Sequence, residues 1–362
     1  MYRFGKRIPK LVLAVLMIAG FAGLLFFGAG RLHLGPRSPG SGGSGDTVET
    51  NQGGPVEPLH PLSIEYMRQQ EYPGSEIITE QTLPPGSNYR RYIVSYRSDG
   101  LKIYALLTVP NGNPPAGGWP VIVFNHGYIP PAEYRTTERY SAYTDAFSRS
   151  GYILIRPDYR GHGNSEGNPE GAYYSPAYTV DVLNAVSSIK RYPGADSSRI
   201  GMWGHSMGGS ITLRSMVVNP DIKAGVIWAG VVASYDDLVK NWRRPGSKPW
   251  QPSQREQAIR RPSRQMLVDQ YGDTDANPQF WNSISPISFV PDISGPVQIH
   301  HGDADSSVPI LFSQRLQDAL TAAGNTSELY TYPGDDHNLS ANLSTALSRS
   351  VRFFDTYLKA SE

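Results

Sequence analysis

Hydrophobic positions follow two alternating patterns along the chain from about residue 89 onward. Short uninterrupted apolar runs, such as 121–124, are typical of strands buried on both faces. Longer stretches with apolar residues three or four positions apart, such as 178–191, predict amphipathic helices. Two β-rich runs, 91–96 and 102–109, flank Ser98-Asp99-Gly100 and predict a hairpin. Because strands then alternate with helices, we expect an α/β fold whose mostly parallel sheet is flanked by helices and led by this antiparallel hairpin.

The same pattern gives bounds for the other expected elements. Helices are expected at 62–70, 134–149, 178–191, 207–218, 310–323 and 340–358, and further strands at 120–125, 152–156, 200–203, 224–229, 296–300 and 328–332. Between 234 and 290 the alternation stops, and the sequence becomes polar, aromatic and rich in arginine. Because this stretch lies between two sheet strands, it must leave the sheet at the strand ends, and we interpret it as a helical cap insertion.

The N-terminal segment differs from the rest of the chain. Residues 11–30 carry no charge and follow a basic segment, 1–10. A helix of this length spans roughly 30 Å, the thickness of a bilayer core. We expect a transmembrane signal anchor with 1–10 in the cytoplasm and the remainder outside it; a cleaved signal peptide followed by secretion is the second interpretation. A stretch rich in Gly, Pro and Ser, 31–58, predicts a flexible linker, which leaves 59–362 as the folded domain.

Composition and charge exclude several classes of function. The chain of 362 residues is 39% hydrophobic and 18% charged, with a formal net charge of +1. This balance gives no basic face, so a nucleic-acid partner is not indicated. The absence of cysteine excludes disulfides, thiolate nucleophiles and metal sites with cysteine ligands.

The strongest chemical motif is Gly204-His205-Ser206-Met207-Gly208, which joins the strand 200–203 to a predicted helix. Gly-x-Ser-x-Gly between a strand and a helix is the nucleophile-elbow pattern. The turn is so tight that glycines must flank the serine, and we expect Ser206 to project above the sheet edge as a nucleophile. The candidates for an oxyanion hole are two backbone N–H groups. Met207 directly follows the serine, and Tyr128 lies in the loop that follows the strand 120–125.

A histidine and an acid should follow such a serine at later strand ends. His337 is the only histidine in a loop after the last predicted strand, so it is the expected general base. Asp303 and Asp305 follow the strand 296–300, and either could be the acid that orients His337. Asp303 also suits a loop-shaping role, in which its side chain bonds nearby backbone N–H groups.

Other residues are candidates for binding a metal ion or for lining a substrate pocket. His300 and His301 are neighbours on one strand and point to opposite faces, so we do not expect them to share a metal ion. No metal and no cofactor is expected. Three tryptophans of the predicted cap are candidates for an apolar substrate pocket: Trp242, Trp250 and Trp281.

With these motifs in order, the chain from about residue 89 to residue 358 resembles the α/β-hydrolase superfamily. Within it, the chain is most similar to the catalytic domain of the prolyl-oligopeptidase family and its dipeptidyl- and acylaminoacyl-peptidase relatives. In that family His-Gly-x-x-Asp-x-x-Val-Pro carries the acid, so the resemblance implies Asp305. It also implies a serine peptidase that works through an acyl-enzyme. The stretches that carry the resemblance are Tyr96-Arg97-Ser98-Asp99-Gly100, Asn125-His126-Gly127, Asp158-Tyr159-Arg160-Gly161, Arg199 to Ser206, Ser285-Pro286-Ile287 and His301 to Pro309.

Three functions remain open from the sequence. The first is a prolyl-oligopeptidase-like peptidase acting on small peptides. The second is a carboxylesterase or lipase-like enzyme acting on small acyl esters; it is favoured by the lack of room for the family's N-terminal propeller and by the size of the predicted cap. The third is a non-catalytic binding protein on a hydrolase scaffold, against which a complete Ser-Asp-His set argues.

Overall fold

A nine-stranded sheet runs through the computed structural model, which describes residues 58–242 and 254–359, the side chains of 254–262 excepted. The strand order is β1-β2-β3-β5-β4-β6-β7-β8-β9. The pairs β1–β2, β2–β3 and β3–β5 are antiparallel, and every pair from β5 to β9 is parallel. The predicted hairpin and mostly parallel sheet are therefore confirmed. The strands are β1 (Ile78–Leu83), β2 (Tyr89–Ser98), β3 (Leu101–Pro110), β4 (Trp119–Asn125), β5 (Ile153–Pro157), β6 (Ala195–His205), β7 (Ile222–Trp228), β8 (Val297–Gly302) and β9 (Ser327–Tyr332).

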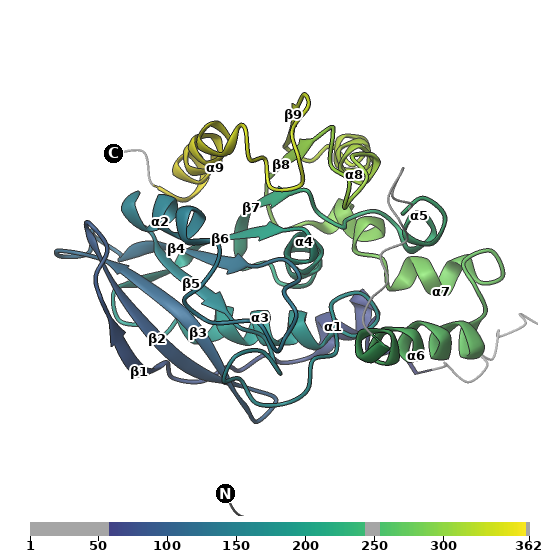
Figure 1. The fold of residues 1–362 in the computed structure, drawn as a ribbon, viewed down its shortest axis with the longest axis horizontal. Helices are drawn as coiled ribbons and strands as arrows, with labels where there is room; N and C mark the ends of the chain where they lie inside the picture. The colour runs from purple at the N-terminus through teal and green to yellow at the C-terminus, as the bar shows by residue number, and fades with distance from the viewer. Residues whose placement is uncertain (1–57, 243–253, 360–362) are drawn as a thin grey trace, which may run out of the picture. The chain divides into compact units, whose positions relative to one another are not determined.

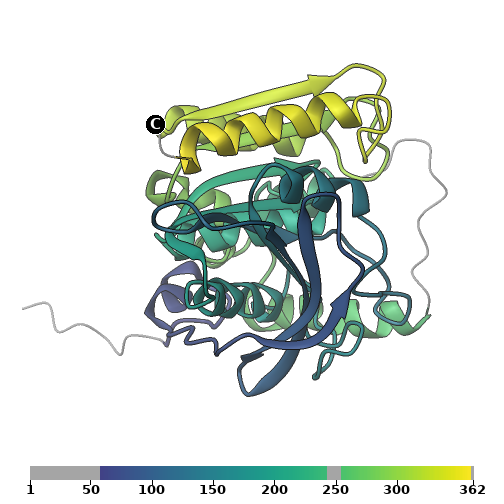
Figure 2. The same cartoon turned by 90° about the vertical axis from the view of Figure 1, so that its left-hand side faces the viewer.

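Helices cover both faces of this sheet (Figure 1, Figure 2). One face carries α1 (Ile64–Gln69), α3 (Ala177–Ile189), α4 (Met207–Val218) and α8 (Leu311–Ala322). The other face carries α2 (Ser141–Arg149) and α9 (Leu343–Leu358). The arrangement buries the sheet on both sides, which is why its central strands are apolar at almost every position.

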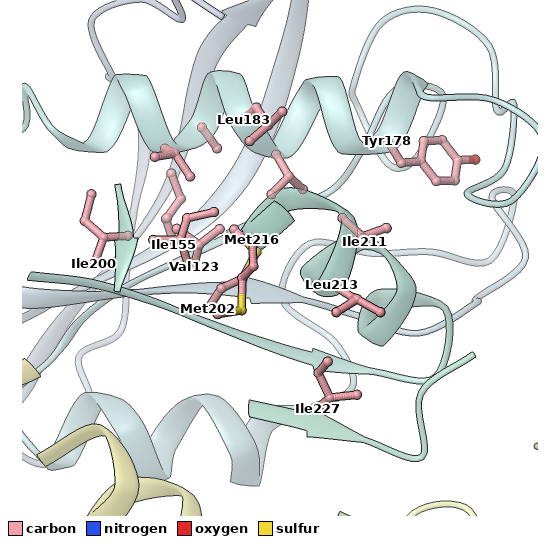
Figure 3. Close-up of a cluster of buried hydrophobic side chains, with 14 of the residues drawn as sticks. Val123, Ile155, Tyr178, Leu183, Ile200, Met202, Ile211, Leu213, Met216 and Ile227 are labelled. Carbon is pink, nitrogen blue, oxygen red and sulfur yellow. The ribbon is translucent and has the colours of Figure 1, made fainter. Parts of the chain in front are cut away.

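Strand β4 shows how the two cores are built. Val121 and Val123 point into the core under α3 and α4, whereas Ile122 and Phe124 point into the core under α2 and α9. Successive side chains of a strand point to opposite faces, so one short run of apolar residues supplies both cores. Figure 3 shows the first core, with Val123 among side chains from α3, α4 and the neighbouring strands.

The predicted helix 134–149 is wrong in its first half, because α2 begins only at Ser141. The carbonyl groups of Thr136, Glu138 and Arg139 accept hydrogen bonds from the buried guanidinium of Arg156. Arg139 and Tyr140 also have positive φ angles, 54° and 53°. Carbonyls committed to a side chain and backbone in the left-handed region are both incompatible with a continuous α-helix.

The described part of the stretch 234–290 is helical, with α5 (Tyr235–Lys240), α6 (Gln254–Tyr271), α7 (Pro278–Ser283) and the 3₁₀ helix η1 (Pro286–Asp292). Figure 1 shows α5, α6 and α7 grouped together beyond α4. Trp281 and Ile284 of this stretch pack with Leu62, Tyr235 and Leu267 in a small core of their own. The helical character that was predicted for this insertion is thus present in the residues described.

Several predictions concern the N-terminus. The basic segment 1–10, the transmembrane segment 11–30 and the linker 31–58 lie outside the described residues, except for residue 58. Within the described ranges, no helix has the length and apolar character needed to cross a membrane.

Candidate active site

Ser206 lies on the turn that joins β6 to α4. Its backbone has φ 56° and ψ −117°, a strained conformation for a residue other than glycine. The Ser206 N–H donates to the Trp228 carbonyl at 2.9 Å, and the Ser206 carbonyl accepts from Gly209 N–H at 3.0 Å and Val231 N–H at 3.2 Å. These bonds hold the strained turn between β7 and the first turn of α4. The geometry is that of a nucleophile elbow.

The two glycines of the motif are required by close backbone contacts. A Cβ atom on Gly204 would lie 2.3 Å from the Gly208 carbonyl oxygen, and one on Gly208 would lie 2.0 Å from the Asn125 carbonyl oxygen. Both distances are far below van der Waals contact. Strand β4, strand β6 and helix α4 can therefore approach each other only where these side chains are absent.

Asp305 and His337 come from the loops that follow β8 and β9, and the structure brings them together. His337 Nδ1 lies 2.6 Å from Asp305 Oδ2. The Asp305 side chain has no exposed area, and its Oδ1 accepts from the N–H groups of Ser307 at 2.7 Å and Val308 at 3.0 Å. Burial alone would raise the pKa of Asp305, but the hydrogen bonds from His301 and His337 outweigh it, so the pKa lies well below its usual range and the carboxylate is ionised.

His301 is a further partner of Asp305 that the sequence did not assign. Its Nε2 lies 3.1 Å from Asp305 Oδ2 and 3.1 Å from the Val308 carbonyl, and its Nδ1 lies 2.7 Å from Ser313 Oγ. The carbonyl can only accept, so Nε2 carries the proton and donates to the carboxylate. The His-Gly-x-x-Asp spacing was the available signal. Asp303, the second candidate for the acid, is turned away and accepts from Gly334 N–H at 2.6 Å, a loop-shaping bond.

Two cavities meet beside the elbow. The first, which we call the Ser206 cavity, has a volume of about 340 Å³ and is lined by Gly127, Tyr128, Ile129, Arg139, Tyr140, Tyr143, His205, Ser206, His337 and Asn338. The second, the Trp242 cavity, has a volume of about 190 Å³ and is lined by Tyr128, Pro131, Pro169, Glu170, Gly171, Ala172, Tyr173, Tyr174, Tyr178, Met207, Trp242 and Ser263. Ser206 and His337 line the first cavity, Met207 lines the second, and Tyr128 lines both.

The loop after β4 is held against the elbow by a chain of hydrogen bonds. Gly127 N–H donates to Tyr140 Oη at 3.0 Å, Tyr140 Oη lies 2.8 Å from His205 Nδ1, and His205 Nε2 lies 2.9 Å from the His337 carbonyl. Burial, together with the nearby His337 ring, lowers the pKa of His205 to about 3, so the ring is neutral. Its Nε2 faces a carbonyl and must carry the proton, so Nδ1 accepts the Tyr140 hydroxyl proton.

This chain has consequences for the predicted oxyanion hole. Because Gly127 N–H is bonded to Tyr140, it is not directed at a substrate. Met207 is the first residue of α4, and the first N–H groups of a helix have no partner within it. His205 and Tyr140 were missed by sequence reasoning. His205 occupies a variable position of the elbow motif, and Tyr140 depends on a loop conformation that no local pattern encodes.

The three tryptophans predicted to bind substrate lie in different places. Trp242 lines the Trp242 cavity, and its Nε1 donates to the Ser307 carbonyl at 2.9 Å. Trp281 is buried in the small core of the cap, where its Nε1 donates to the Gly272 carbonyl at 3.0 Å, and it does not line either cavity. Trp250 lies outside the described residues.

The motif Asp158 to Gly163 serves the architecture around the site. Arg160 binds Asp181 of α3 through Nε and Nη2 at 2.8–3.2 Å and also reaches Asp99 in the hairpin turn at 2.9 Å. Asp158 accepts from the hydroxyls of Tyr134 and Thr136 at 2.9 and 2.6 Å. Within the described part of the chain, no group of three or more His, Asp or Glu side chains is arranged to hold a metal ion.

Comparison with known proteins assigns the family. The model of the prolyl oligopeptidase family matches residues 138–361. This range contains the elbow serine, the acid and the histidine described above. The chain belongs to the prolyl oligopeptidase family. Membership of this hydrolase family indicates that the protein is an enzyme.

The chain is also similar to individual proteins, among them peptidases and an esterase. An uncharacterised peptidase of Bacillus subtilis (strain 168), YtmA, is 24% identical over 264 residues, which cover 72% of this chain and 91% of that protein. The structure of a puromycin-hydrolyzing peptidase of Mycobacterium tuberculosis has a TM-score of 0.59 at 20% identity, covering 76% of this chain and 41% of that one. An acetyl xylan esterase from Paenibacillus sp. R4 has a TM-score of 0.61 at 18% identity, covering 82% and 92%. These structures share the α/β-hydrolase fold, and this chain spans about two fifths of the length of the puromycin-hydrolyzing peptidase.

Proposed function

We propose that the protein is a serine hydrolase that cleaves peptide or other amide bonds through an acyl-enzyme. Ser206 is the nucleophile, His337 the general base and acid, and Asp305 the carboxylate that orients His337. The observation that carries this proposal is the 2.6 Å contact between His337 Nδ1 and Asp305 Oδ2, with His337 and Ser206 lining one cavity. A carboxylate on Nδ1 leaves Nε2 as the nitrogen that faces the serine.

The reaction has two half-reactions in this proposal. Ser206 Oγ attacks the substrate carbonyl while His337 Nε2 takes its proton, and the N–H groups of Tyr128 and Met207 stabilise the negative charge on the carbonyl oxygen. His337 then donates that proton to the leaving amine, and the C–N bond breaks. Water, deprotonated by His337, attacks the acyl-enzyme and releases the acid and the free serine. The buried, ionised Asp305 stabilises the imidazolium that forms in both halves.

Peptide substrates are preferred because the chain belongs to a peptidase family and matches an uncharacterised peptidase over most of both lengths. A specific observation supports esters as the second candidate. The Trp242 cavity, next to both proposed oxyanion donors, is lined mainly by aromatic and apolar residues, with Glu170 as the one charged residue of its lining. Such a cavity suits an apolar acyl group.

Probe labelling and substrate profiling test the proposal. A fluorophosphonate should label the wild-type protein at Ser206, and Ser206→Ala should abolish both labelling and turnover while leaving the thermal unfolding transition in place. Aminoacyl anilides assayed beside p-nitrophenyl esters of the same acyl groups distinguish the two candidates. Labelling that persists in Ser206→Ala, or turnover that survives it, would overturn the proposal.

We also propose, from the sequence alone, that residues 11–30 anchor the enzyme in a membrane with its catalytic domain outside the cytoplasm. The hydropathy of this segment and the basic residues before it support the proposal. The full-length protein should remain in the membrane fraction after a carbonate wash, and protease added outside the cell should degrade the catalytic domain. Recovery of the whole chain in the soluble fraction would contradict it.

A further inference from the structure

The Ser206 cavity lies on the side where the leaving group must depart. In the proposed reaction His337 gives its proton to the leaving atom, so the leaving group has to lie beside His337. His337 and Asn338 line only the Ser206 cavity, whereas Met207 and Trp242 line only the Trp242 cavity. The acyl group therefore occupies the Trp242 cavity, and the leaving group occupies the Ser206 cavity.

One cation lines the leaving-group side. Among the described residues that line the two cavities, Arg139 is the only arginine or lysine, and it belongs to the Ser206 cavity. Its nearest acidic partner is Glu133, at 3.8 Å, and both side chains are more than half exposed, at 57% and 63%. An exposed pair at that distance is weak and is screened by salt. The guanidinium is therefore available to an anionic ligand.

The backbone that carries Arg139 is fixed from inside the protein. The fully buried guanidinium of Arg156 donates to the Arg139 carbonyl at 2.9 Å and also binds the carbonyls of Thr136 and Glu138. Arg139 and Tyr140 both adopt left-handed backbone conformations, with φ 54° and 53°, which cost energy in residues other than glycine. Because Arg156 fixes this strained turn, the backbone position from which the Arg139 side chain extends at the cavity is also fixed.

We propose that Arg139 binds the carboxylate of the leaving group, so that the preferred substrates are short peptides whose leaving residue carries the free C-terminal carboxylate. This inference rests on the proposed function of Ser206 and His337. A guanidinium pairs with a carboxylate through two parallel hydrogen bonds, which orients the leaving residue as well as attracting it. In the step itself the bond from Ser206 Oγ to the acyl carbon forms and the C–N bond breaks. The amine leaves with a proton from His337, and the carboxylate is unchanged.

The test compares two substrates that differ only at the leaving-group carboxylate. The full-length protein is assayed on benzyloxycarbonyl-Phe-Leu with a free C-terminus and on the same peptide with a C-terminal amide. The apolar Phe is chosen for the Trp242 cavity. We expect kcat/KM for the free acid to exceed that for the amide by tenfold or more, and this ratio to fall toward one as NaCl is raised.

Three variants make the test specific. Arg139→Gln should lower the acid-to-amide ratio tenfold or more, and Glu133→Gln should raise it, because the competing carboxylate is removed. Arg135→Gln is the matched control: Arg135 lies on the same loop, donates to the carbonyls of Ala132 and Tyr134, and should leave the ratio as it is. Equal ratios in wild type and Arg139→Gln would overturn the inference, as would failure to cleave either dipeptide by an enzyme that the fluorophosphonate labels. A wild-type protein that the probe does not label would instead overturn the proposed function.

Discussion

The imidazole of His301 donates to Oδ2 of Asp305, the same carboxylate oxygen that His337 contacts. The two contacts measure 3.1 Å and 2.6 Å. Two backbone N–H groups occupy the other oxygen, Oδ1. Among the described residues, the four groups that hydrogen-bond this carboxylate are all donors, so the position favours a side chain that can accept on both oxygens.

Asp305→Asn should lower kcat by roughly 10³–10⁴-fold, as the loss of a triad acid does elsewhere. An NH₂ at the Oδ2 position would face the donors of His301 and His337 and remove the acceptor that fixes the His337 tautomer. An NH₂ at the Oδ1 position would face the N–H groups of Ser307 and Val308. Either orientation also removes the negative charge that stabilises the His337 imidazolium. Asp303→Asn is the matched control, because an amide oxygen can still accept from Gly334 N–H. Steady-state rates on one ester and one anilide measure both variants. A larger loss in Asp303→Asn would reassign the acid.

Tyr140→Phe should lower kcat by about tenfold to a hundredfold with little change in KM. The variant leaves Gly127 N–H without its acceptor and His205 Nδ1 without its donor. We therefore expect the loop that carries Tyr128 to shift. Small displacements near the reacting atoms lower the rate strongly. His205→Asn should have a similar effect. If the two residues act in one chain, the double variant loses about as much as the worse single variant rather than the product of both.

A control for this prediction is Tyr152→Phe. Tyr152 is fully buried and likewise donates its hydroxyl to a side chain, that of Asp355 at 2.7 Å, but it lines neither the Ser206 nor the Trp242 cavity. The variant should lose stability without losing kcat. Independent, multiplying losses for Tyr140 and His205 would contradict the coupled chain.

Arg160→Met should destabilise the fold by about 3–5 kcal/mol, because it leaves the buried carboxylate of Asp181 without its counter-ion. Burial already raises the pKa of Asp181 in spite of its bonds to Arg160. Arg97→Met removes an exposed pair with Glu166 at 3.5 Å and should change stability by less than about 1 kcal/mol. Urea unfolding of the two variants measures the difference. Similar losses in both would mean that the Arg160 pair is solvated.

Acid should destabilise the protein below about pH 6.5 through its buried histidines. Burial lowers the pKa of His162 to about 4, and burial with nearby Arg349 lowers the pKa of His300 to about 3; His205 behaves in the same way. The unfolded chain binds these protons at about pH 6.5. Stability is therefore complete above that value and is lost as the pH falls toward 3–4, by up to about 1.4 kcal/mol per pH unit for each histidine.

Urea unfolding at pH 7, 6 and 5 measures this slope. His300→Gln should reduce the number of protons taken up on unfolding by about one, and the slope falls accordingly. The amide can still bond Tyr332 and Gln298 but does not titrate. Unfolding free energies that stay constant from pH 7 to pH 5 would show that these rings are protonated in the folded protein.

Much of the fold could be predicted from periodicity, because the sheet is buried on both faces and its strands are nearly continuous apolar runs. The strand β1 could not, since five of its six residues are exposed and no apolar alternation marks it. The predicted start of α2 was wrong for a different reason. Its preceding loop is held by Arg156, a residue of β5, and a local pattern cannot encode a bond to a distant side chain.

The candidate site divides in the same way. Ser206, Asp305 and His337 follow strand ends, which parallel topology gathers at one edge, so their order along the chain was sufficient to predict their meeting. Arg139 and Tyr140 depend on one loop conformation, and His205 acquires its role only through its bond to Tyr140, so none of the three carries a local signal. Trp281 was placed in the pocket by its residue type alone, and the helical packing of the cap buries it elsewhere.

The outermost strand, β1, affects how the protein behaves at high concentration, where the sheet edges of two molecules can pair. Its ladder with β2 is interrupted between Thr79 and Gln81, where Glu80 forms an ion pair with Lys102 at 2.7 Å, and Pro84-Pro85 follows its last residue. A strand arriving from a second molecule would meet a kinked edge, a charge and two residues without N–H groups. Such edges resist intermolecular pairing, so the sheet is protected on this side against growth into fibrous aggregates.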